Sequence, residues 1–199
     1  MDIRKLYFRT SNLLIKPIQE FDSISIDNQS IKEINRSVLI PYSILIAICA
    51  FFGSVFTHIG SPLETVIFVL LNAVIVFFIV YLQSFLGGKL IAILGKNINI
   101  SNKKESVYAL VVYSQIPFYL LLALVKIFPS LIFLIFLSAY SGYLIYVGID
   151  ALLKISSVRK TQFLILSMII LIALFITISE LFTLLYSEII DLFSTFAVL

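Results

Sequence analysis

Five stretches of about 19 to 24 residues contain no charged side chain, and this feature constrains the fold most strongly. They are Ser37–Thr57, Thr65–Gly88, Ser106–Val125, Ile127–Ile149 and Thr161–Ser179. A helix of ~20 apolar residues crosses the ~30 Å hydrocarbon core of a bilayer. Backbone groups in lipid must be hydrogen-bonded within their own segment, so these stretches predict helices. The predicted fold class is therefore all-α, a polytopic membrane bundle with five transmembrane helices.

The lysines and arginines fall almost entirely on one side of these five spans. Of the 14 basic residues, all but one lie in the N-terminal tail, in the second loop or in the fourth loop; the exception is Lys126, at a span boundary. Basic loops stay preferentially in the cytoplasm, so the N-terminus is predicted to be cytoplasmic and the C-terminus outside. An odd number of spans also requires the two ends to lie on opposite sides.

The chain is predicted to have three parts. Residues 1–36 form a cytoplasmic tail with interfacial helices, residues 37–181 the five-helix membrane domain, and residues 182–199 an outside tail. Pro17 suits the first turn of a short helix in the cytoplasmic tail. Apolar residues recur at three- and four-residue steps after the fifth span, which predicts a helix up to about Phe196.

Several local signals predict where the long helices begin and end. Ser30 and Glu33 have the spacing of a capping box and indicate the start of the first long helix. Pro62 follows a serine and precedes a glutamate, which favours a helix start there. Gly87-Gly88 is predicted to break the second helix. The loop Lys89–Glu105 is then expected to lie on the membrane surface.

The sequence carries little that could support catalysis. His58 is the only histidine and Cys49 the only cysteine, and these two cannot supply a zinc ligand set. No charged residue lies in the middle third of any span, whereas proton and ion pathways normally depend on such residues. We therefore expect a protein that is not an enzyme, with no catalytic residue, no metal site and no cofactor.

Uncharged polar side chains do lie within the spans. We consider these a candidate polar core: Asn72, Tyr113, Gln115, Pro117, Tyr140, Ser141, Tyr143 and Tyr146. Depth counted along the helices places Gln115, Ser141 and Asn72 near the midplane. Gln115 is expected to face the fourth helix and to bond near Tyr140–Ser141 or to a tyrosine hydroxyl, with Asn72 also turned inward. The set is consistent either with simple helix packing or with a ligand-lined cavity.

Several of these stretches resemble a known family. They are Leu13-Leu14-Ile15-Lys16-Pro17, the segment from Tyr108-Ala109 to Pro117, the segment Tyr143–Ile149, and Arg159–Phe163. In these residues the chain resembles the Yip domain family, named for interaction with Ypt/Rab GTPases, in its bacterial branch. The resemblance covers most of residues 13–180. Asp150 departs from it, because bacterial relatives usually carry a proline there, and the tail after Glu180 is longer than usual.

The resemblance implies a non-enzymatic integral membrane protein that serves as a scaffold or adaptor in membrane organisation, or as a partner of another membrane complex. The alternative is a small transporter or channel for a lipid or an uncharged solute through the polar bundle centre. The expected partners are the lipid bilayer and another membrane protein, with no nucleic acid. The expected location is the bacterial cytoplasmic (inner) membrane.

The predicted topology can be tested by scanning single cysteines with a membrane-impermeant thiol reagent. Positions in Lys96–Lys104 and Arg159–Lys160 should react from the cytoplasm, whereas Gly60 and Ser194 should react from outside. Labelling of Gly60 and Lys103 from the same side would contradict the five-span arrangement.

Overall fold

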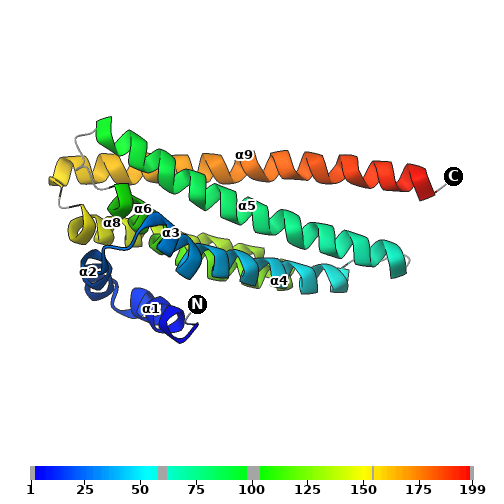
Figure 1. Ribbon diagram of the computed structural model, residues 1–199, viewed down its shortest axis with the longest axis horizontal. Coiled ribbons are helices and arrows are strands. Elements are labelled where there is room, and N and C mark those ends of the chain that lie inside the picture. The colour runs from blue at the N-terminus through cyan, green and yellow to red at the C-terminus, as the bar shows by residue number, and fades with distance from the viewer. Residues whose placement is uncertain (1–2, 58–61, 98–103, 154, 198–199) are drawn as a thin grey trace.

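The computed structural model describes residues 3–57, 62–97, 104–153 and 155–197, and all regular structure among them is helical (Figure 1). The elements in chain order are α1 (Ile3–Ile15), α2 (Pro17–Asp27), α3 (Ile31–Ile34), the π-helical turn η1 (Asn35–Leu39), α4 (Ile40–Thr57), α5 (Pro62–Asn97), α6 (Lys104–Ser114), α7 (Ile116–Ile127), the 3₁₀ segment η2 (Pro129–Ala139), α8 (Tyr140–Leu152) and α9 (Ser157–Ala197).

Five helical segments are long and apolar enough to cross a membrane. They are Ile31–Phe56, Thr65–Gly95, Lys104–Ile127, Pro129–Leu152 and Arg159–Ile190. Each contains most or all of one predicted span, so the all-α five-helix fold is confirmed. The third segment is the centre of the bundle. In its apolar 18-residue stretch 67% is buried, compared with 17% in the corresponding stretches of the second and fifth segments.

The predicted start of the first long helix is also confirmed. The Ser30 hydroxyl accepts a hydrogen bond from the Glu33 backbone N–H, and the Glu33 carboxylate accepts one from the Ser30 backbone N–H at 2.8 Å. This reciprocal pair satisfies two backbone donors that a helix start leaves free. Pro17 opens α2 as predicted, and α2 continues to Asp27.

The predicted break at Gly87-Gly88 is wrong, because α5 continues through both glycines to Asn97. The glycines instead permit close packing. A Cβ atom at Gly88 would lie 2.6 Å from the Tyr108 ring, and one at Gly87 would lie 2.7 Å from the Leu171 side chain. The first half of the predicted surface loop is therefore helical, and residues 98–103 lie outside the described residues.

Three irregularities within the spans accompany prolines, and the longest is the 3₁₀ segment η2, which begins at Pro129. Pro41 has no backbone N–H to donate to the carbonyl four residues earlier, and the π-helical turn η1 ends at Leu39, two residues before it. Pro117 interrupts the third span in the same way. There the chain makes a turn at Gln115 between α6 and α7, and the Gln115 N–H bonds to the Val112 carbonyl at 3.3 Å.

The two longest helices, α5 and α9, run antiparallel and side by side (Figure 1). Phe78 stacks on Phe182 and Phe68 meets Tyr186 edge-on, both with 6.4 Å between ring centroids. Helix α9 continues past Glu180 to Ala197 without interruption. At the end of the bundle where α9 begins, α2 packs against α8, far from the C-terminus (Figure 1).

Helices α4 and α7 approach each other closely at Gly53. A Cβ atom at this position would lie 1.8 Å from the backbone carbonyl oxygen of Lys126. Backbone cannot move aside as a side-chain tip can, so only glycine fits here.

We predict that Gly53→Ala destabilises the fold by about 1–3 kcal/mol, because the added methyl group overpacks a backbone contact. The matched control is Gly142→Ala, since a Cβ there would lie 3.4 Å from the flexible end of Met168. Unfolding in mild detergent, followed by circular dichroism, measures both. Equal stability of the two variants would contradict the close approach of α4 and α7.

Candidate functional site

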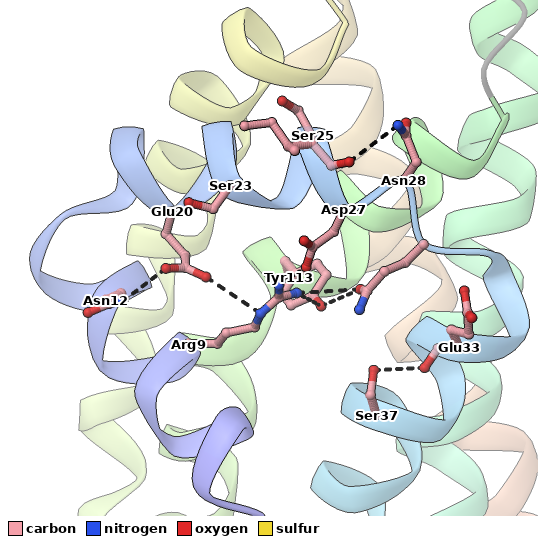
Figure 2. Close-up of polar contacts among 12 residues, drawn as sticks. Arg9, Asn12, Glu20, Ser23, Ser25, Asp27, Asn28, Glu33, Ser37 and Tyr113 are labelled. Atoms are coloured by element: carbon pink, nitrogen blue, oxygen red, sulfur yellow. Dashed lines mark hydrogen bonds and ion pairs between the residues drawn. The ribbon is translucent and has the colours of Figure 1, made fainter. Parts of the chain in front are cut away.

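A buried arginine joins the N-terminal helices to the membrane bundle (Figure 2). Arg9, on α1, donates from Nη1 to the Tyr113 hydroxyl of α6 at 2.7 Å. Its Nη2 forms an ion pair with the Asp27 carboxylate at the end of α2. The Nε of Arg9 lies 3.6 Å from Oε1 of Glu20, which is also on α2. One guanidinium therefore connects α1 to both α2 and α6.

Further hydrogen bonds extend this arginine cluster. The Tyr113 hydroxyl, which accepts from Arg9, donates to Gln29 Oε1 at 2.8 Å. Asn12 donates to the second oxygen of Glu20 at 3.0 Å. The hydroxyl of Thr10, the residue after Arg9, lies 2.5 Å from the hydroxyl of Tyr42 on α4. Helix α1 is thus bonded to the first and third spans as well as to α2.

Three residues of the arginine cluster are buried, so their hydrogen bonds and ion pairs are shielded from water. Arg9 is 9% exposed, Glu20 7% and Tyr113 0%. Burial acts to lower the pKa of Arg9, but the Tyr113 hydroxyl and the Asp27 carboxylate outweigh it, and the pKa is raised above its ordinary value. Arg9 therefore stays charged, and removing it would leave buried partners without compensation.

Sequence reasoning missed the arginine cluster. Charge patterning uses Arg9 only as one of the basic residues of the N-terminal tail, whereas the structure turns Arg9 toward the bundle together with Leu13, one turn later and fully buried. The outward face of the two helices mixes polar and apolar side chains, and Tyr7, Ile15 and Ile26 are each more than two-thirds exposed. Leu6, Arg9 and Leu13 are spaced by three and four residues, so they lie on one face of the helix. This spacing is the sequence feature that indicates that Arg9 faces the bundle.

A second polar cluster lies within the spans, around Gln115. Gln83 of α5 donates from Nε2 to Gln115 Oε1 at 3.0 Å. Ser84 donates to Gln83 Oε1 at 2.8 Å, and the Tyr119 hydroxyl donates to Ser84 at 2.7 Å. The prediction that Gln115 bonds to the fourth helix is therefore wrong, because its hydrogen-bond partner is Gln83 of α5. Depth counted along a helix gives the height of a residue but not the neighbour it faces.

The other candidate polar residues are dispersed. Asn72 turns inward and donates to Ser54 of α4 at 2.6 Å. Pro117 and Ser141 are buried, and Tyr140 donates to the Leu14 carbonyl of α1 at 3.1 Å. Tyr143 and Tyr146 are 47% and 45% exposed, so they lie outside the buried core.

Asp150, the position that departs from the resemblance, forms an ion pair with Lys160 at the start of α9. The Lys160 ammonium also lies 3.6 Å from the centroid of the Tyr146 ring. Among the described residues, no three His, Cys, Asp or Glu side chains are grouped so that they could hold a metal ion. The contacts of Lys160 with Asp150 and Tyr146 join the start of α9 to α8.

We predict that Arg9→Met loosens α1 and α2 from the bundle by about 3 kcal/mol, because Glu20 and Tyr113 lose their buried cation. Hydrogen exchange of the α1 and α2 amides should then become about 100-fold faster, while the α5 amides change little. Lys16→Gln is the control, since it removes one positive charge from an exposed side chain on the same segment. Unchanged exchange in Arg9→Met would contradict the role of Arg9.

The Yip1 domain family matches residues 12–179, a region that begins within α1 and ends within α9. No curated protein and no solved structure matches the chain. The matched region contains the greater part of all five membrane-spanning segments and four of the five principal residues of the arginine cluster, namely Glu20, Asp27, Gln29 and Tyr113. The chain is therefore an integral membrane protein that belongs to the Yip1 domain family.

Proposed function

We propose that this protein is a non-enzymatic adaptor of the bacterial cytoplasmic membrane, which presents its folded N-terminal helices to another membrane protein. The observation that carries the proposal is the arginine cluster. A buried ion pair costs desolvation energy and contributes little net stability, but it fixes one geometry. The arginine cluster lies at the junction of α1, α2 and α6. Its position there supports a partner-binding surface on the N-terminal helices that needs a fixed shape.

A polar cleft beside the cluster is the surface that we assign to the partner. It has a volume of about 480 Å³ and is lined by Lys5, Asp27, Gln29, Glu33, Arg36 and Ser37. Asp27 and Gln29 are also bonded within the arginine cluster, so Arg9 holds part of the cleft wall in place. The lining contains two basic and two acidic residues. A polar protein segment that carries both charges complements such a cleft better than a simple ion does.

The alternative function, transport of a lipid or of a small uncharged solute, has one observation in its favour. A cavity of about 130 Å³ lies within the spans and is lined in part by Gln83, Gln115 and Ser141. Transport requires the protein to move a solute between the two sides of the membrane. A vesicle flux assay with the purified protein separates this alternative from the adaptor function.

Photocrosslinking in intact cells tests the adaptor function. A benzophenone amino acid at Arg36, which lines the cleft, should give one discrete protein adduct, whereas the same group at the exposed Ser187 near the other end of α9 should not. In an Arg9→Met background the Arg36 adduct should fall by about tenfold or more, since the cleft wall is no longer held.

The exposed-charge control Lys16→Gln should leave the adduct unchanged. Absence of any discrete adduct from Arg36, or an adduct that is insensitive to Arg9→Met in a folded protein, would contradict the proposal.

A further inference from the structure

The cavity within the spans combines apolar walls with buried polar atoms that have no partner. Its apolar lining includes Phe118, Ile145, Met168 and Phe175, from α7, α8 and α9. Gln115 and Ser141 also line it, and they are 3% and 7% exposed. Within the described part of the chain, Gln115 Nε2 and Ser141 Oγ make no hydrogen bond. Each such group costs free energy unless something bonds to it.

The hydrogen bonds around Gln115 run in one direction. Tyr119 donates to Ser84, Ser84 donates to Gln83, and the Gln83 amide nitrogen donates to Gln115 Oε1. Because the Gln115 oxygen already accepts, the group left at the end of the chain is the Gln115 amide nitrogen, which can only donate. The Ser141 hydroxyl can also donate. The cavity therefore presents donors and favours a ligand that accepts.

No residue that lines the cavity is charged, which disfavours an ion as the ligand. The volume of about 130 Å³ is close to that of the engineered protein cavity of ~150 Å³ that holds benzene. Ile172 lines the cavity and is 55% exposed, so one wall reaches the lipid-facing surface of α9. A molecule dissolved in the bilayer can thus place one end inside while the rest stays in lipid.

From this geometry we infer that the cavity binds the carbonyl end of a neutral, membrane-dissolved molecule. The carbonyl oxygen accepts from Gln115 Nε2 and Ser141 Oγ, and the apolar walls enclose a group about as large as one six-membered ring. Met168 can adapt its flexible side chain to the shape of that group. This binding site does not depend on the adaptor function, because none of its lining residues belongs to the arginine cluster or to the polar cleft.

Two probes of nearly the same shape test the inference. Acetophenone carries a carbonyl where α-methylstyrene carries a carbon–carbon double bond, so the two differ chiefly in the ability to accept a hydrogen bond. The purified full chain in detergent should bind acetophenone about three- to tenfold more tightly than α-methylstyrene, as one or two added hydrogen bonds predict. The infrared carbonyl band of bound acetophenone should move to lower frequency than in detergent alone.

Variants at one residue connect this binding to the cavity. Ser141→Ala removes a hydroxyl without breaking a hydrogen bond, so the protein should fold normally and the preference for acetophenone should shrink. Ser141→Leu fills the cavity and should abolish binding of both probes. The matched control is Ser54→Ala, which removes a hydroxyl that bonds to Asn72 outside the cavity and should leave binding unchanged.

Equal affinity for the two probes, no binding of either probe by the wild-type protein, or unaltered binding in a folded Ser141→Leu variant would each overturn the inference. No binding of either probe would indicate that water, or nothing, occupies the cavity. Unaltered binding in Ser141→Leu would indicate that the probes bind elsewhere on the protein.

Discussion

The position of the N-terminal helices depends on one buried guanidinium. Arg9 contacts Tyr113 of the third span, Asp27 at the end of α2 and Glu20 within α2, so three helices share a single charge. Such a cluster adds little net stability, because the desolvation of its charges offsets their attraction. It does restrict the alternatives: any other placement of α1 leaves Arg9 or its carboxylates unpaired. The amphipathic tail is thereby fixed in one orientation against the bundle.

The bilayer imposes a second constraint, because water is not available there to bond polar groups. Two of the three proline-associated irregularities of the spans coincide with polar side chains that bond to other helices. At η1, Asn35 accepts a hydrogen bond from the Tyr108 hydroxyl. At the turn between α6 and α7, Gln115 accepts one from Gln83. At these two sites, helix-to-helix hydrogen bonds support the irregular backbone.

The sequence predicts those features that follow from local chemistry. Uncharged stretches of the right length locate the five spans, and the serine–glutamate pair at Ser30 locates the start of the first. Gly87-Gly88 was misread, because the same residue type ends helices and permits close packing, and only the neighbours Tyr108 and Leu171 decide which. The partner of Gln115 and the inward direction of Arg9 depend on how helices face one another. Periodicity along one segment does not contain that information.

The attachment of α2 to the bundle by Arg9 is tested most directly by a distance measurement in liposomes. Spin labels are placed at Ser23, exposed on α2, and at Ser157, exposed at the start of α9. Helix α2 and the start of α9 lie at the same end of the molecule (Figure 1). Pulsed electron paramagnetic resonance should give a narrow distance distribution for the wild-type protein and a broad one for Arg9→Met. A broad distribution in the wild type, or an equally narrow one in the variant, would contradict the account.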